Sequence, residues 1–152
     1  MSRNGWIAVA GLGSLALLAG AFGFQYLGGL APCKMCLWQR WPHVAAVLVA
    51  LFALAFGQWS KGSLMPALGA LAALVSAGLG AYHTGVERGW WQGPSSCSGG
   101  AGGDLLRMDG PLDMVMCDTV AWQMLGLSMA GWNMLASLGL AAIWVMAARR
   151  AA

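Results

Sequence analysis

The sequence predicts an all-α membrane protein: a four-transmembrane-helix bundle with two loops on one side of the membrane. Hydrophobic residues make up 59% of the 152 residues and charged residues only 9%, whereas a soluble domain carries about 25% charged residues. Four segments of nearly membrane-spanning length contain no Asp, Glu, Lys or Arg. A helix needs roughly 20 apolar residues to cross a bilayer, so each segment can form one span of a single domain, residues 1–152.

The four expected spans cover about residues 5–27, 41–59, 64–84 and 126–147, and the two longer connections about residues 28–40 and 85–125. Within the first span, Ala19-Gly20-Ala21 is similar to a signal-peptide cleavage site. The apolar stretch is longer than the roughly 7–15 residues usual in such peptides, so we expect a retained helix. The net charge of +3 is small, and without a basic stripe it gives no support for nucleic-acid binding.

Four spans place both chain ends on the same side of the membrane. That side holds four basic residues and no acid: Arg3, Lys61, Arg149 and Arg150. The other side also holds four basic residues, so the positive-inside rule gives a tie. Lys61 breaks it because it lies in a tight loop, whereas Arg88 and Arg107 lie in a loop of about 40 residues, where the rule weakens. We therefore expect cytoplasmic termini, with the two longer loops on the outer side of the membrane.

All four cysteines lie in these two outer loops, Cys33 and Cys36 in the first and Cys97 and Cys117 in the second. An oxidising compartment permits disulfides, and an even number of cysteines there indicates two pairs. The spacing does not choose among the three possible connectivities. A structural zinc site usually combines two close cysteine pairs, and Cys97 and Cys117 are 20 positions apart, so we expect no metal.

The Cys33-Lys34-Met35-Cys36 motif is the most specific signal in the chain. It precedes the second span, where free N–H groups and the helix dipole favour negative charge, and Lys34 adds a positive charge. Cysteines in such settings have lowered pKa values, and a low-pKa thiolate leaves readily in disulfide exchange. The alternative is a structural disulfide that stiffens the loop.

Arg40 follows Cys36 by four residues, so the two share a face if the helix begins near Cys33. Pro42 leaves this open, because it suits the first turn of a helix that begins near Trp41 and would kink one that begins earlier. A guanidinium at a membrane edge is a candidate functional group that can hold a thiolate or a quinone oxygen. The alternative is an arginine that anchors the helix to lipid phosphates.

The second outer loop admits two interpretations of its cysteines. If Cys97 and Cys117 pair, the bond can act as a structural staple worth about 3 kcal/mol. An exposed disulfide beside the flexible glycine tract 99–103 is also easy for another thiol to attack. Apolar residues within 105–116 are compatible with a short helix lying on the membrane surface.

These features resemble the bacterial disulfide bond formation protein B (DsbB) family over nearly the whole chain. The most specific segments are Pro32-Cys33-Lys34-Met35-Cys36-Leu37-Trp38-Gln39-Arg40, Tyr82-His83-Thr84-Gly85-Val86-Glu87, and Cys117-Asp118 followed by Gly126-Leu127-Ser128-Met129. The resemblance implies a thiol:quinone oxidoreductase that reoxidises a periplasmic DsbA-like thiol oxidase. It also implies disulfides between Cys33 and Cys36 and between Cys97 and Cys117.

In the mechanism that the resemblance implies, reduced DsbA attacks the Cys97–Cys117 disulfide and remains bound to Cys97. Cys117 then attacks Cys33, and the released Cys36 thiolate reduces ubiquinone or menaquinone. The matching positions for quinone contacts are Arg40, His83 and Met129.

Three alternatives remain open on the sequence. One is a related oxidase with a dedicated partner, since the glycine tract replaces a longer polar stretch of the family. Another is a non-enzymatic membrane protein with two structural disulfides. The third is an enzyme of the vitamin K epoxide reductase type, although its Cys-X-X-Cys lies at the last core helix rather than between the first two.

Overall fold

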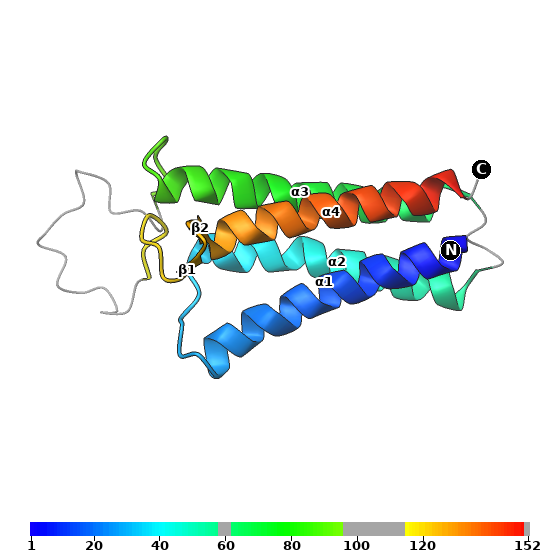
Figure 1. The fold of residues 1–152 in the computed structure, drawn as a ribbon, viewed down its shortest axis with the longest axis horizontal. Coiled ribbons are helices and arrows are strands. Elements are labelled where there is room, and N and C mark those ends of the chain that lie inside the picture. The colour runs from blue at the N-terminus through cyan, green and yellow to red at the C-terminus, as the bar shows by residue number, and fades with distance from the viewer. Residues whose placement is uncertain (58–61, 96–114, 151–152) are drawn as a thin grey trace, which may run out of the picture.

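A computed structural model describes residues 1–57, 62–95 and 115–150 of the chain. Most of these residues form four helices: α1 (Arg3–Tyr26), α2 (Lys34–Ala55), α3 (Leu64–Glu87) and α4 (Met129–Arg149). Each is long and apolar enough to cross a membrane, and they lie side by side along one axis (Figure 1). The predicted four-helix membrane bundle is thereby confirmed.

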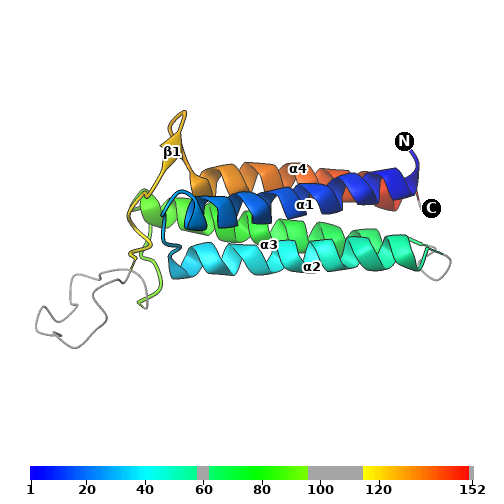
Figure 2. The ribbon, with the colours of Figure 1, turned by 90° about the horizontal axis from the view of Figure 1, so that it is seen from below.

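The two ends of the bundle differ in what they carry (Figures 1 and 2). The start of α1, the end of α4, the end of α2 and the start of α3 lie at one end, which we call the terminal end. The α1–α2 connection and a small hairpin lie at the other, which we call the cysteine end. The hairpin pairs β1 (Gln123–Met124) with β2 (Leu127–Ser128) in antiparallel register. Leu125 and Gly126 both have positive φ, as a two-residue hairpin turn of type I′ requires.

Helix α2 begins at Lys34, earlier than the start near Trp41 that Pro42 suggested. Cys33 is its N-cap, with extended backbone and a sulfur that accepts a hydrogen bond from the Cys36 N–H at 3.2 Å. This bond satisfies one of the free N–H groups at the helix start. Pro42 is accommodated inside the helix, so Cys36 and Arg40 lie one turn apart on the same helix.

Small residues let the helices approach closely, as is common in membrane bundles. A Cβ atom on Gly80 would lie 2.9 Å from the Ala130 carbonyl oxygen and 3.0 Å from the Met134 nitrogen. The backbones of α3 and α4 are therefore in contact at this point, one turn before His83. This contact sets the position of His83 relative to the start of α4.

The bundle contains two separate clusters of buried hydrophobic residues. The larger, which we call the terminal-end core, consists of Ile7, Ala10, Ala50, Ala53, Ala70, Ala73, Leu140, Ala141, Trp144 and Ala147. The smaller, the cysteine-end cluster, consists of Cys33, Met35, Val86 and Cys117. Polar side chains are buried elsewhere in the bundle, among them Gln39, His43, Ser76 and His83.

Candidate functional site

Cys33 and Cys36 are free thiols whose sulfur atoms lie 2.7 Å apart at the start of α2. Cys33 is buried, with 4% of its surface exposed, and Cys36 is half-buried. The structure thus presents the pair in its reduced form. The Cys33–Cys36 disulfide implied by the family resemblance is the oxidised form of the same two residues and stays a prediction.

Cys117 brings the second outer loop to this pair. Its sulfur is disulfide-bonded and the residue is fully buried. The Cys117 sulfur, the Cys33 sulfur and a ring nitrogen of His83 all lie within 4.8 Å of one another. Cys97 lies outside the described residues, as do the glycine tract and residues 105–114 of the expected surface helix, whereas residues 115 and 116 are described and are not helical. The predicted Cys97–Cys117 pairing therefore stays a prediction. The described part of the site places a disulfide sulfur beside a free thiol.

The same three atoms have the separation that a metal site would need. Zinc binds cysteine as the thiolate, and the Cys117 sulfur is already in a disulfide. Thiol–disulfide exchange needs a thiolate next to a disulfide sulfur, which is what Cys33 and Cys117 supply. The arrangement therefore fits exchange between sulfur atoms better than metal binding.

The environment of Cys33 favours its ionised form. A hydrogen bond from the Cys36 thiol is the largest cause that lowers the pKa of Cys33, and burial opposes it. His83 and the backbone N–H of Cys36 act in the same direction as the thiol, and the resulting pKa is about 4. Cys33 is therefore a thiolate at neutral pH. Lys34, expected to contribute charge, instead places its ammonium group over the Trp38 ring at 5.9 Å.

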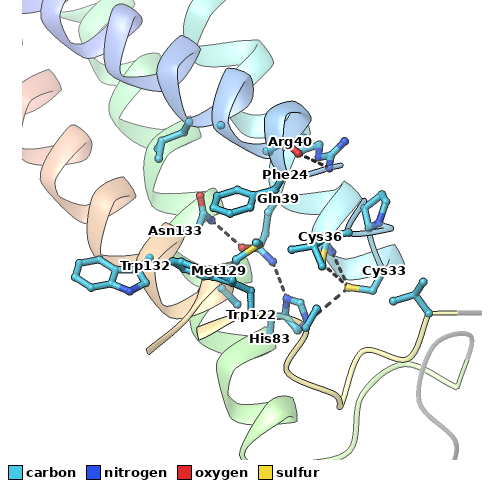
Figure 3. A pocket seen from close by; sticks show the side chains of 18 of the residues that line it. Phe24, Cys33, Cys36, Gln39, Arg40, His83, Trp122, Met129, Trp132 and Asn133 are labelled. Carbon is cyan, nitrogen blue, oxygen red and sulfur yellow. Dashed lines mark hydrogen bonds between the residues drawn. The ribbon is translucent and has the colours of Figure 1, made fainter. Parts of the chain in front are cut away.

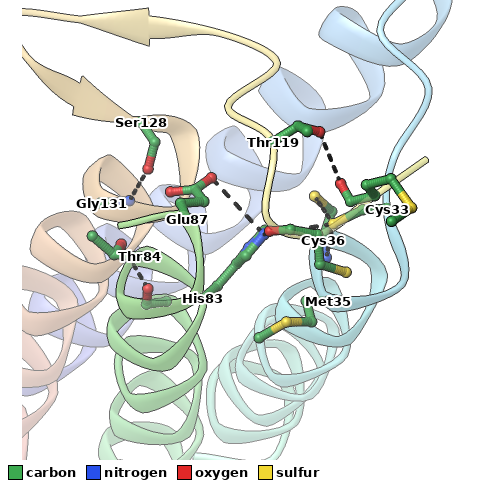
Figure 4. Close-up of polar contacts among 12 residues, drawn as sticks. Cys33, Met35, Cys36, His83, Thr84, Glu87, Thr119, Ser128 and Gly131 are labelled. Atoms are coloured by element: carbon green, nitrogen blue, oxygen red, sulfur yellow. Dashed lines mark hydrogen bonds and ion pairs between the residues drawn. The ribbon is translucent and has the colours of Figure 1, made fainter. Parts of the chain in front are cut away.

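His83 reaches the sulfur atoms from the last turn of α3 (Figure 4). Its Nε2 lies 3.6 Å from the Cys33 sulfur, 3.2 Å from the Cys117 carbonyl oxygen and 3.9 Å from Glu87 Oε1. Its Nδ1 lies 2.9 Å from Gln39 Nε2. The sequence placed His83 beside a quinone, and the structure places it in contact with the cysteines as well as at the edge of a cavity.

This cavity, of about 420 Å³, lies between α1, α2 and α4 next to the cysteines (Figure 3). Figure 1 shows α1 diverging from the other helices toward the cysteine end. All the described residues that the sequence selected, except Cys117, line the cavity: Cys33, Cys36, Arg40, His83 and Met129. The rest of the wall is mostly apolar, with Leu17, Ala21, Phe24 and Trp122 among its residues.

Arg40 is held at the wall of the cavity by α1. Its guanidinium donates to Gln25 Oε1 at 2.7 Å and to the Ala21 carbonyl at 3.4 Å, and it lies over the Phe22 ring at 4.9 Å. A guanidinium has five N–H donors, and these two bonds occupy two of them. Arg40 therefore keeps donor capacity while its position is fixed, which a freely moving lipid anchor would not show.

Four polar residues around the site were assigned no role from the sequence: Gln39, His43, Glu87 and Asn133. Gln39 and His43 line the cavity from α2, Asn133 from α4, and Glu87 lies four residues after His83 on α3. A signal was present, because polar residues inside an apolar span are expensive and usually functional. The i,i+4 spacing of His83 and Glu87 was also visible in the sequence.

The fold and the site together define a multi-pass membrane protein that holds two free thiols and a disulfide-bonded cysteine beside an apolar cavity. The sequence model of the family "Disulfide bond formation protein DsbB" matches residues 2–147. The chain belongs to this family of disulfide bond formation proteins.

Individual relatives agree with this assignment. The chain is 32% identical to disulfide bond formation protein B of Dechloromonas aromatica, over 93% of this chain and 89% of the relative. It is 34% identical to the protein of the same name from Aromatoleum aromaticum, over 91% and 92% of the two chains. For that of Methylococcus capsulatus the identity is 36%, over 84% and 82%. No solved structure matches the chain.

Proposed function

We propose that this protein is a thiol:quinone oxidoreductase that reoxidises a periplasmic DsbA-like dithiol oxidase. Electrons enter at the Cys97–Cys117 disulfide, pass to the Cys33–Cys36 pair and leave to ubiquinone or menaquinone. The observation that carries the proposal is the Cys117 sulfur, which lies within 4.8 Å of the Cys33 sulfur at the edge of the cavity. Two sulfur atoms from different loops are thus within reach of exchange.

The burial of Cys117 supports the order of the steps. Because Cys117 is 0% exposed, a thiol of a soluble protein cannot reach its sulfur and must attack the sulfur bonded to it, which we assign to Cys97. That attack forms the mixed disulfide and releases Cys117 as a thiolate. Cys117 then attacks Cys33, the Cys33–Cys36 bond breaks, and the electron pair remains on Cys36. Each step makes one S–S bond and breaks one.

The cavity suits a quinone in size and chemistry. Small-molecule sites typically measure about 300–1,000 Å³ and are apolar with a few polar groups, and this cavity of about 420 Å³ has that character. A bound quinone would accept two electrons and two protons and leave as the quinol. Arg40 can donate hydrogen bonds to a ring oxygen, Cys36 faces the same cavity, and Phe24 and Trp122 help to exclude water.

The membrane placement follows from the same arrangement. The cysteine end of the bundle must face the periplasm if a soluble oxidase is to reach it, which puts the termini in the cytoplasm of a bacterial inner membrane. A non-enzymatic protein with two independent structural disulfides gives no reason for Cys33, Cys117 and His83 to converge. This convergence therefore favours the enzyme over the structural alternative.

A turnover assay tests the proposal. Purified protein is mixed with a reduced DsbA-type oxidase and a soluble quinone analogue, and quinone absorbance is followed. We expect quinone consumption that depends on both the oxidase and this protein. Consumption no faster than without the protein would rule out the enzyme.

Trapping tests the site of partner attack. A DsbA-type oxidase that lacks its second active-site cysteine is mixed with the protein, and the mixed disulfide is mapped by mass spectrometry. We expect it at Cys97, because the Cys117 sulfur is shielded. A complex through Cys117 would reverse the roles of the two residues. Isolation of trapped complexes from cells would then identify the natural partner and distinguish a general from a dedicated oxidase.

A further inference from the structure

Buried polar side chains continue from His83 into the bundle as a hydrogen-bonded chain (Figure 3). Gln39 Nε2 lies 2.9 Å from His83 Nδ1. Asn133 Nδ2 donates to Gln39 Oε1 at 2.8 Å, and Asn133 Oδ1 lies 3.0 Å from His43 Nε2. The chain thus connects α3, α2 and α4 and joins the two histidines of the protein through two amides.

The donors and acceptors along this hydrogen-bonded chain can be assigned, because some of the partners can only accept a hydrogen bond. Gln39 Nε2 also lies 3.3 Å from the Met35 carbonyl oxygen, and a carbonyl only accepts hydrogen bonds. The nitrogen of the Gln39 amide must therefore be on the side of His83 and Met35, which leaves its oxygen facing Asn133. The orientation of an amide is assigned from its partners in this manner.

The same reasoning fixes the amide of Asn133. Its Nδ2 lies 3.5 Å from the Ser76 carbonyl oxygen and 3.1 Å from Ser76 Oγ. The Ser76 hydroxyl donates its hydrogen to the main-chain carbonyl oxygen of Gln39, so toward Asn133 the hydroxyl can only accept. The Asn133 nitrogen therefore faces Ser76 and Gln39, and its oxygen faces His43.

The consequence reaches the sulfur atoms. Because the Gln39 amide donates to His83 Nδ1, that nitrogen must accept, and the ring hydrogen of neutral His83 must be on Nε2. Nε2 is the atom that lies 3.6 Å from the Cys33 sulfur and 3.2 Å from the Cys117 carbonyl oxygen. An N–H group thus faces the site where the two loops exchange a disulfide.

We propose that Gln39 and Asn133 are positioning residues that lock His83 in its Nε2–H tautomer and so keep a hydrogen-bond donor directed at the sulfur atoms. His83 transfers no proton in this role; its fixed N–H stabilises the thiolate that Cys33 carries when the Cys33–Cys36 pair is reduced. Orientation of an imidazole through the hydrogen bond on its other nitrogen is a general device of histidine sites. The benefit to disulfide exchange rests on the proposed function, whereas the tautomer itself does not.

Nitrogen NMR of histidine-labelled protein in detergent tests the proposal directly. The chain has two histidines, and the signals that disappear in His83→Gln belong to His83. With Cys33 and Cys36 reduced, we expect His83 to show a pyridine-type Nδ1 and a pyrrole-type Nε2. A proton on Nδ1 would overturn the proposal, whether or not Nε2 also carries one. This measurement needs no quinone, no partner and no turnover, so its failure is distinct from a failure of the enzyme assay.

Two nearly isosteric variants test whether the hydrogen bonds of Gln39 and Asn133 set the tautomer of His83. Gln39→Glu replaces the donor to Nδ1 with an acceptor, and we expect a proton to appear on His83 Nδ1. Asn133→Asp, although it does not contact His83, places an acceptor against Gln39 Oε1. We expect the Gln39 amide to rotate and His83 again to gain a proton on Nδ1. If Nδ1 stays unprotonated in both variants, the proposal is wrong.

Ser14→Ala is the matched control, because Ser14 is fully buried in α1 and does not line the cavity. Its His83 signals should match those of the unmodified protein. If the His83 nitrogen signals moved as far in Ser14→Ala as in Gln39→Glu, any change in the core would alter the protonation of His83. That result would also overturn the proposal. A second readout is the pH at which Cys33 becomes reactive to alkylation. This pH should rise in Gln39→Glu and Asn133→Asp and stay constant in Ser14→Ala.

Discussion

The two ends of the helix bundle are built by opposite rules. At the terminal end the buried residues are apolar and mostly small, and the indole of Trp144 packs against Gly69. Toward the cysteine end the same helices bury Gln39, His43 and His83, which would be costly in a membrane without partners. The apolar half of the bundle stabilises the packing of the helices, and this stability offsets the cost of burying polar groups in the other half.

This comparison shows how the polar half is tolerated. Each of its amides has hydrogen-bond partners on neighbouring helices, as in the bond between Asn133 on α4 and Gln39 on α2. Interhelical bonds of this kind contribute about 0.6–2 kcal/mol each in membranes. The polar groups therefore fix the relative positions of α2, α3 and α4 next to the cysteines, while the terminal-end core fixes the fold.

The largest expected effect is the loss of turnover in Cys36→Ser, which removes the thiol that faces the cavity. Quinone reduction should fall to the background rate in the assay described above, because a serine hydroxyl cannot form the disulfide. The melting temperature in detergent should change little, since Cys36 lies outside the terminal-end core. Retained turnover would show that the cysteine end does not perform the chemistry assigned to it.

The second effect is on the ionisation of Cys33. Its pKa is lowered from 9.0 to about 4, so the thiolate persists at neutral pH and is lost only as the pH falls through about 4. The ionised thiolate favours the folded protein above pH 9, and this contribution disappears as the pH falls from 9.0 to about 4.

Alkylation measures this ionisation. In the reduced protein the alkylation rate of Cys33, followed by mass spectrometry of the labelled peptide, should be flat around neutral pH and fall near the pKa. Cys36→Ala removes the main hydrogen bond to the sulfur, so the midpoint should rise by about 1 unit or more. An unchanged midpoint would assign the lowered pKa to another group.

Arg40→Ala should have an intermediate effect that is confined to quinone use. We expect the apparent KM for quinone to rise about tenfold, equivalent to about 1.4 kcal/mol, because the loss of one charged hydrogen bond is of this size. Arg40→Lys keeps the charge but not the planar donor group and serves as the matched variant. Equal kinetics in all three proteins would return Arg40 to an anchoring role.

The smallest effect separates packing at the terminal end from chemistry at the cysteine end. A Cβ atom on Gly69 would collide with the Trp144 ring, whereas one on Gly78, in the same helix, would meet nothing within 4 Å. Gly69→Ala should destabilise the protein by about 1–3 kcal/mol, and Gly78→Ala should be neutral or slightly stabilising. Thermal unfolding in detergent measures both. Turnover below the melting temperature should be the same in the two variants.

The four spans could be predicted because a membrane helix is recorded locally, as a run of residues without charge. The start of α2 and the presence of the hairpin could not be predicted in this way. The start depends on a thiol cap at Cys33 that precedes an internal proline, and the hairpin depends on positive φ at Leu125, a residue that rarely adopts it.

The site shows the same division. Cys33, Cys36 and Arg40 could be selected because they lie within one short motif with its own chemistry. Gln39, Asn133 and Glu87 could not be assigned a role, because their partners lie on other helices. Which faces of those helices meet is decided by packing contacts such as that of Gly80 with the backbone of α4, and a single sequence does not specify this register.

The depth of Cys33 and Cys117, with 4% and 0% of their surfaces exposed, has a consequence for selectivity. A strongly oxidising sulfur centre that is open to its surroundings would be discharged by any small reductant that diffuses past. In the proposed relay, an external thiol would therefore enter only at the sulfur bonded to Cys117, because the Cys33 and Cys117 sulfurs are covered by the protein. Oxidation of outside thiols would then pass through a single entry point instead of occurring at each cysteine.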